Sequence, residues 1–212
     1  MTLTLLGCAT TSAATHVGAA VEVVDRNSDS FPYFSSAGFG AIIAAYGAFC
    51  DLPRNLAGSC DPVRFRSAYS DVGVQIWCSG EAIVGFGAAL TGRLMKRDAG
   101  PECKVDLSTF AAICPGSVVD DGSEPPKVGA SSELIAPMMV AYSDLCTHLP
   151  GPRCDLREFR TQFLAISAHV VKDGTVLVSF YPRKDQAPNR AVEYHIDRAT
   201  LAITSSSADS RP

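Results

Sequence analysis

One pattern of residues occurs twice in this chain of 212 residues, and it constrains the fold more than any other feature. In each copy a tyrosine precedes a cysteine by four positions, and a Cys-Asp pair is followed by Phe-Arg. The first copy is Tyr46, Cys50, Cys60-Asp61 and Phe65-Arg66, and the second is Tyr142, Cys146, Cys154-Asp155 and Phe159-Arg160. We interpret the pattern as an internal duplication.

Each copy also contains the pattern of one helix followed by three strands. Apolar residues at spacings of three and four predict helices over residues 36–49 and 132–149. Apolar or alternating runs bounded by turn residues predict the strands. These cover residues 72–78, 81–90 and 104–113 in the first copy and 164–171, 175–181 and 191–203 in the second. We expect an α+β protein of two tandem repeats, each a helix packed on a three-stranded antiparallel meander and braced by disulfides.

Small and acidic residues mark the turns of these meanders. The sequences at 79–80 and 172–174 predict tight hairpin turns between the first two strands of each copy. Asp106 and Asp197, each three positions before a threonine, predict a turn or bulge within the third strand rather than a catalytic group. Tyr46, Tyr142 and Trp77 are expected in the core rather than in a ligand site.

Composition divides the chain into five segments. Residues 1–8 have the character of a lipoprotein signal, and residues 9–35 form a small, polar tether. The repeats occupy residues 36–115 and 130–212, and residues 116–129, rich in proline, glycine and acidic groups, join them as a linker.

The charge balance argues against a nucleic-acid partner. The chain is 47% hydrophobic and 19% charged, which is a globular composition. Residues 36–115 carry seven acidic and seven basic side chains, and residues 130–212 carry nine of each. A neutral repeat gains little counterion-release energy, so we expect no nucleic acid as a partner, and no cluster of Lys and Arg suggests attraction to anionic lipid.

Eight cysteines favour disulfides over a metal site. The repeated pairs enclose nine and seven residues, whereas zinc sites use a two-residue spacing or nearby histidines. We therefore predict two bridges in an oxidising compartment, Cys50–Cys60 and Cys146–Cys154.

Three further cysteines occur only in the first copy: Cys78, Cys103 and Cys114. The sequence leaves their pairing open. We favour Cys78 with Cys114, because the ends of the first and third strands of a meander lie at the same edge of the sheet.

The N-terminus predicts export. Leu5-Leu6-Gly7-Cys8 resembles the bacterial lipoprotein box, which implies lipidation at Cys8 and a periplasmic protein anchored by lipid to the outer membrane. The seven residues before Cys8 include no Lys or Arg, unlike a full export signal. The alternative is an ordinary N-terminus with a free thiol.

No recognised catalytic motif is present. The chain lacks a Walker loop, a dinucleotide fingerprint, a His-Glu-x-x-His motif and a nucleophile elbow. His169 and His195 have no counterpart in the other copy and no cysteine or carboxylate at ligand spacing. We therefore expect no enzyme activity, no cofactor and no metal.

The sequence at 192–201, Val-Glu-Tyr-His-Ile-Asp-Arg-Ala-Thr-Leu, resembles the closing strand of helix-plus-meander domains in secreted bacterial proteins. Such domains include the PepSY repeat, cystatin-like folds, nuclear-transport-factor-like folds and immunity proteins against interbacterial toxins. That family position usually carries glycine after the threonine, where this chain has Leu201. The resemblance implies a protein that acts by binding rather than by catalysis.

Two polar loops are the expected binding surface. They span residues 91–103 and 182–190, and we predict that their charged side chains contact a partner: Arg93, Lys96, Arg97, Asp98, Arg183, Lys184 and Asp185. We hypothesise an immunity or inhibitor lipoprotein that binds a toxin or hydrolase in the periplasm. The alternative is a module that binds a small ligand or an envelope component, which requires a concave apolar pocket. The oligomeric state stays open.

Overall fold

The computed structural model of the protein describes residues 32–50, 61–77, 79–88, 102–114, 129–148, 155–171, 174–183 and 190–207. One succession of elements occurs twice in these ranges: a short strand, two helices and four strands. The first series is β1 (Tyr33–Ser35), α1 (Ser36–Cys50), α2 (Pro62–Ala68), β2 (Tyr69–Ile76), β3 (Glu81–Ala88), β4 (Glu102–Asp106) and β5 (Ala112–Ile113). The second series is β6 (Gly129–Ser131), α3 (Ser132–His148), α4 (Leu156–Gln162), β7 (Phe163–Val170), β8 (Thr175–Pro182), β9 (Val192–Asp197) and β10 (Ile203–Ser206). The α+β class predicted from the sequence is confirmed.

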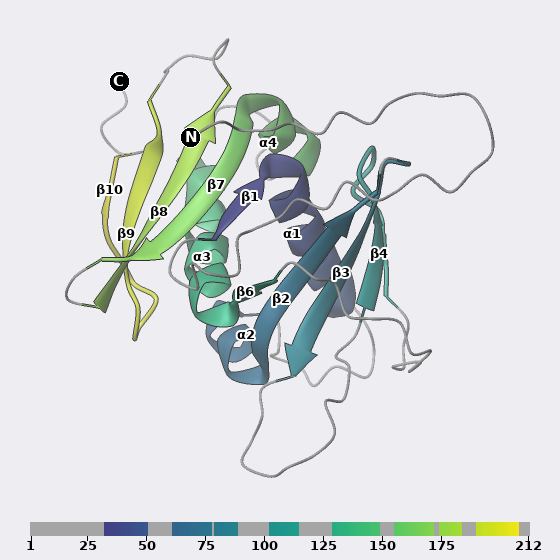
Figure 1. The fold of residues 1–212 in the computed structure, drawn as a ribbon. Helices are drawn as coiled ribbons and strands as arrows, with labels where there is room; N and C mark the ends of the chain where they lie inside the picture. The colour runs from purple at the N-terminus through teal and green to yellow at the C-terminus, as the bar shows by residue number, and fades with distance from the viewer. Residues whose placement is uncertain are drawn as a thin grey trace.

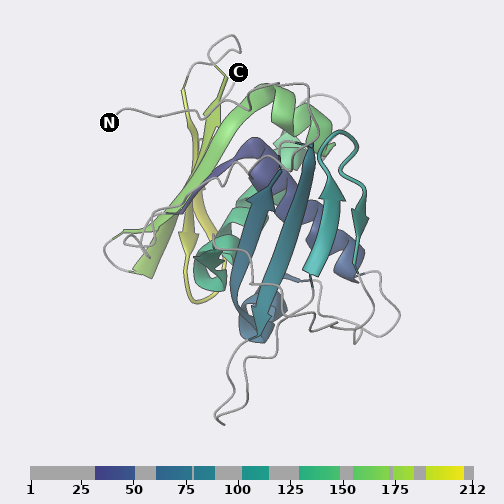
Figure 2. The ribbon, with the colours of Figure 1, turned by 45° about the vertical axis from the view of Figure 1, so that its right-hand side comes forward.

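Two antiparallel sheets enclose the long helices α1 and α3 (Figure 1). One sheet has the strand order β1-β7-β8-β9-β10, and the other has the order β5-β4-β3-β2-β6. Helix α1 packs mainly on the second sheet and α3 mainly on the first, and a turned view shows the same three layers (Figure 2). A single hydrophobic core joins the layers and includes Phe39, Ile42, Val84, Ile135, Met138 and Val178.

The first strand of each series pairs with the sheet of the other series. Phe34 in β1 faces Ile166 in β7, and Ala130 in β6 faces Val72 in β2. Phe34 is 1% exposed, so burial of its ring holds this strand in place. Each sheet therefore has five strands rather than the predicted three, because it receives one exchanged strand and because the predicted third strand folds into two.

A short second helix follows each long one, and the sequence analysis missed both. The Asp of each repeated Cys-Asp pair is the N-cap. The Asp61 carboxylate accepts hydrogen bonds from the backbone N–H groups of Val63 and Arg64 at 2.8 and 3.1 Å, and Asp155 accepts one from Arg157 at 2.8 Å. A helix of one or two turns depends on such a cap and on tertiary packing, so its sequence shows little periodicity.

The predicted third strand breaks at a tight turn in both series, as Asp106 and Asp197 suggested. Asp106 Oδ1 accepts from the backbone N–H of Ser108 at 2.7 Å, and Asp197 Oδ1 accepts from that of Thr200 at 2.7 Å. The chain then reverses and pairs with itself, β4 with β5 and β9 with β10. These aspartates therefore shape turns.

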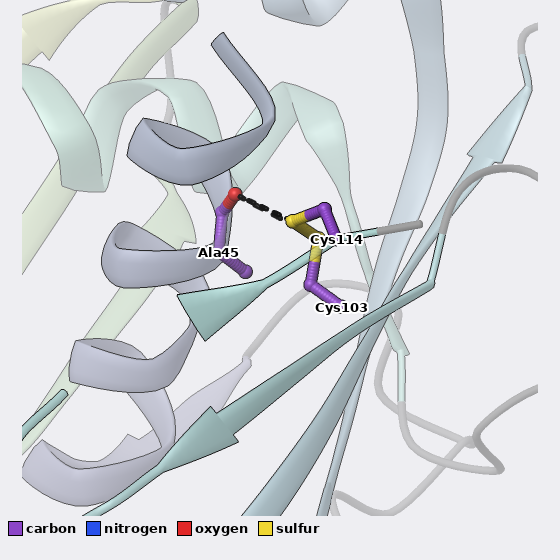
Figure 3. The surroundings of a disulfide bond; sticks show 3 residues. All are labelled: Ala45, Cys103 and Cys114. Carbon is purple, nitrogen blue, oxygen red and sulfur yellow. Dashed lines mark hydrogen bonds between the residues drawn. A yellow bond between two sulfur atoms is a disulfide. The ribbon is translucent and has the colours of Figure 1, made fainter. Parts of the chain in front are cut away.

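This reversal explains why the favoured pair Cys78–Cys114 is wrong. Cys114 is bonded to Cys103, and their Cα atoms are 4.2 Å apart (Figure 3). Cys103 lies on β4 and Cys114 directly follows β5, so the hairpin places them opposite each other. The Cys114 sulfur also lies 3.6 Å from the carbonyl oxygen of Ala45, which packs the bridge against α1.

Cys50 and Cys146 are also disulfide-bonded. The partners predicted for them, Cys60 and Cys154, lie outside the described residues, as do Cys78 and the proposed lipidation site Cys8. The pairings Cys50–Cys60 and Cys146–Cys154 therefore stay predictions.

Candidate functional site

The repeated Phe-Arg pair links each short helix to the opposite sheet. Phe65 is fully buried and Phe159 is 3% exposed, so both rings belong to the core. The arginine that follows each ring reaches a turn of the other series. Arg160 Nη1 donates to the carbonyl oxygen of Leu107 at 2.8 Å, and Arg66 donates to the carbonyl oxygens of Arg198 and Ala199. The duplicated arginines thus brace the two series against each other.

The repeated tyrosines support the same packing. The rings of Tyr46 and Phe65 are 4.9 Å apart, and those of Tyr142 and Phe159 are 5.2 Å apart. Burial, and secondarily the charge of Asp155, raises the pKa of Tyr142 to about 12, so its hydroxyl is neutral at physiological pH. Both tyrosines are in the core, as predicted. The prediction for Trp77 is wrong: it is 37% exposed, because it stands where β2 enters the hairpin turn.

An open hollow of about 370 Å³ lies where α4 meets the turn between β4 and β5. We call it the arginine hollow, and it is lined by Leu107, Ser108, Phe110, Arg157, Arg160, Thr161 and Arg183. Leu107 and Phe110 are almost fully buried and form its apolar part. Three of its seven lining residues are arginines and none is acidic, which favours an anionic ligand.

Backbone carbonyls fix two of the three guanidinium groups. Arg160 donates to Leu107, as described above, and Arg183 Nε donates to the carbonyl oxygen of Arg160 at 3.1 Å. The Arg183 backbone N–H also donates to the carbonyl oxygen of Gln162 at 2.9 Å, which ties β8 to the end of α4. Because each of these bonds uses only part of a five-donor guanidinium, further donors are left for a ligand.

Three carboxylates next to or near the lining residues in the sequence accept hydrogen bonds within their own turn or helix. Asp106 and Asp155 accept from backbone N–H groups of their own turn and helix. Glu158 accepts from the side-chain amide of Gln162 at 2.8 Å. In the described part of the chain, no carboxylate lies within 4.0 Å of the guanidinium groups of Arg157, Arg160 or Arg183.

At the equivalent place in the other series, the corner where α2 meets the turn between β9 and β10, one carboxylate lies beside two arginines. Glu133, the second residue of α3, lies 3.8 Å from Arg66 and 3.2 Å from Arg198. The second residue of α1 is Ala37. The start of α1 lies beside α4, because the rings of Phe39 and Phe159 are 6.0 Å apart. The start of α1 therefore has no carboxylate at the position equivalent to Glu133.

Of the residues predicted to bind a partner, only Arg183 can be placed, and it lies in the arginine hollow. The other six lie outside the described residues: Arg93, Lys96, Arg97, Asp98, Lys184 and Asp185. Sequence reasoning missed Arg157 and Arg160 as site residues. One difference between the copies could have identified Arg157. The residue two positions after the capping aspartate is Val63 in the first copy and Arg157 in the second, so the repeated scaffold does not require an arginine there.

His169 of β7 and His195 of β9 lie on either side of β8 in one sheet, each opposite Leu177.

Among the described residues there is no group of three or more metal-binding side chains. No helix in the same part of the chain is long and apolar enough to cross a membrane.

Comparison with known proteins gives no relative. No protein-family model matches the chain, and neither a curated protein nor a solved structure matches it. Its function has to be inferred from its own residues and geometry.

Proposed function

We propose that this protein is a non-catalytic binding protein that captures and neutralises a protein partner, as immunity proteins and inhibitors do. The observation that carries the proposal is the arginine hollow, which holds Arg183, a residue predicted from the sequence to contact a partner. Arg160 and Arg183 are anchored to backbone carbonyls before any ligand arrives. Such preorganisation lowers the entropic cost of association.

The frame behind this surface consists of two tandem repeats related by a pseudo-twofold axis, with residues 36–115 and 130–212 as the units and 116–129 as the linker. Support comes from the repeated order of elements, the two capped short helices and the two arginine braces. Strand β1 precedes the first predicted unit and extends it toward residue 33.

We place the protein in the periplasm, attached to the outer membrane through a lipid on Cys8. The bridge Cys103–Cys114 and the oxidised states of Cys50 and Cys146 support an oxidising compartment. Replacement of Cys8 by serine should release an anchored protein from the membrane fraction.

The alternative function is binding of a small anionic ligand. One observation favours it: a hollow of about 370 Å³ is within the size of small-molecule sites. Its openness to the surface favours a protein side chain instead, because small-ligand sites usually enclose most of the ligand.

The experiment is affinity capture from an envelope extract with the full chain as bait, starting with any secreted protein encoded beside its gene. A protein that binds in a defined stoichiometry when purified, and loses its own activity in the complex, supports the proposal. Failure to bind any envelope protein, together with measurable binding of a small anion, would favour the alternative.

A further inference from the structure

We infer that the arginine hollow is a carboxylate-binding site, and that its ligand is an acidic side chain of the protein partner. The second part of this inference rests on the proposed function. The site is defined by Arg157, Arg160 and Arg183 on one side and by the apolar side chains of Leu107 and Phe110 on the other.

The three guanidinium groups differ in how much of their donor capacity is used. Among the described residues, Arg157 has no hydrogen-bond or ion-pair partner for its side chain, while Arg160 and Arg183 each use one donor. An arginine without an anion keeps its hydration, and an incoming carboxylate replaces that water with charge-assisted bonds. The site therefore offers donors of Arg160 and Arg183 from fixed directions, together with the unengaged guanidinium group of Arg157.

The molecule itself indicates which anion fits this arrangement. In the other series, Arg66 braces the turn at Arg198, and the carboxylate of Glu133 lies between the two guanidinium groups. Arg160 braces the equivalent turn at Leu107, but Ala37 stands where Glu133 would be. The first series thus has the bracing arginine, Arg160, without a carboxylate at the start of α1, and Leu107 takes the place of Arg198.

A carboxylate on a protein segment fits better than a phosphate group. The counterpart corner accommodates a carboxylate, and the apolar wall of Leu107 and Phe110 gives the methylene groups of an acidic side chain a surface to cover.

The test measures binding of three probes to the purified full chain at low salt by calorimetry: a tetraglutamate peptide, glutarate and inorganic phosphate. Two variants act on the hollow in opposite ways. Arg157→Gln with Arg183→Gln removes donors but leaves the Arg160 brace intact. Ala37→Glu removes no arginine and supplies an internal carboxylate that competes with the ligand. Arg198→Gln at the other corner is the matched control.

We expect tetraglutamate to bind the native chain and the Arg198→Gln control with equal affinity. Its affinity for both hollow variants should be lower by a factor of about ten or more. Added salt should weaken the binding to the native chain. Equal binding to the native chain and the Arg157→Gln/Arg183→Gln variant, or no binding to the native chain, overturns the inference.

The remaining outcomes separate the inference from the proposed function. Tighter binding of glutarate identifies a free dicarboxylate as the ligand and overturns the protein-borne source, and tighter binding of phosphate overturns the carboxylate assignment. A captured protein partner that binds the Arg157→Gln/Arg183→Gln variant as tightly as the native chain overturns the inference and leaves the proposed function intact. Arginine-dependent binding of tetraglutamate without any protein partner contradicts the proposed function and leaves the carboxylate site.

Discussion

Phe110 and Leu201 have the left-handed backbone conformation that bulky residues rarely adopt, with φ of 55° and 60°. Each follows the threonine of a tight turn, and each is nearly buried, at 9% and 6% exposure. Burial of the side chain therefore compensates for the strained backbone. Glycine adopts this conformation without strain, so the native choice of Phe110 and Leu201 points to the packing of their side chains.

Gly40 in α1 makes room for one of these side chains. A Cβ atom at this position would lie 2.6 Å from Cε1 of the Phe110 ring, whereas a Cβ atom at Gly47 of the same helix would meet nothing within 4 Å. We expect Gly40→Ala to lower the free energy of unfolding by about 1–3 kcal/mol. Gly47→Ala, the matched control, should raise it by up to about 1 kcal/mol. Urea unfolding of both variants measures this, and a stabilised Gly40→Ala protein would contradict the packing.

The carboxylates of Asp106 and Asp197 in the two turns make the free energy of unfolding depend on pH. Hydrogen bonds from Thr200 lower the pKa of Asp197, and bonds from Ser108 lower that of Asp106. A lowered folded pKa stabilises the protein above the unfolded value of about 3.9, and this stabilisation is lost as the pH falls through the folded pKa. Asp197→Asn should therefore be less stable than the native chain at pH 7, and the difference should shrink in acid. Glu193→Gln, outside the turn, is the control for urea midpoints measured across this range, and a difference that is independent of pH would rule the mechanism out.

At the scale of elements, the hairpin of β4 and β5 determines which cysteines meet. A continuous third strand would hold Cys103 and Cys114 far apart, whereas the turn after Asp106 brings them opposite each other. The same hairpin carries Leu107 and Phe110 into the arginine hollow. The disulfide therefore braces the element that forms one wall of the candidate site.

Removal of this bridge should reduce stability without changing the fold. On the chain-entropy model, a loop of this size contributes about 2–3 kcal/mol. We expect the double variant Cys103→Ala/Cys114→Ala to have a free energy of unfolding in urea that is lower by about this amount. Its circular dichroism spectrum should match that of the native chain. Peptide mapping without reductant should find Cys103 linked to Cys114 in the native chain. A peptide linking Cys78 to Cys114 would contradict this pairing.

The elements that could be predicted are those with their own periodicity or turn residues. The long helices were predicted within a residue or two, and Gly80 and Gly174, with φ of 86° and 80°, stand in hairpin turns as expected. The short helices α2 and α4 depend on packing of Phe65 and Phe159, which local sequence does not reveal. The arginine hollow is formed by residues from α4, from the turn after β4 and by Arg183 directly after β8, so only the tertiary fold brings its parts together.

At the scale of the whole molecule, neither series is complete without the other. Strand β1 belongs to the first series but pairs with β7, and β6 belongs to the second but pairs with β2. Helix α2 packs against α3, and α4 packs against α1. The core residues of both series form one cluster, so stability is a property of the pair.

Division of the chain between residues 114 and 129 tests this dependence. We expect each piece alone to lack a cooperative thermal transition, because each lacks one strand of its sheet and half of the shared core. When mixed, the two pieces should form a one-to-one complex in size-exclusion chromatography and regain cooperative unfolding. A piece that unfolds cooperatively as a monomer would show that the series fold independently.

The exchange of strands has a consequence for the proposed ancestry of the chain. A single ancestral copy with this order of elements would have completed its sheet with the first strand of a second copy, so it would have existed as a symmetric homodimer. Fusion of two such copies would have made that partner permanent and released each half from the requirement to be identical. The ion pair of Glu133 with Arg198 in one half, and Ala37 at the equivalent position in the other, are the kind of difference that fused copies could acquire.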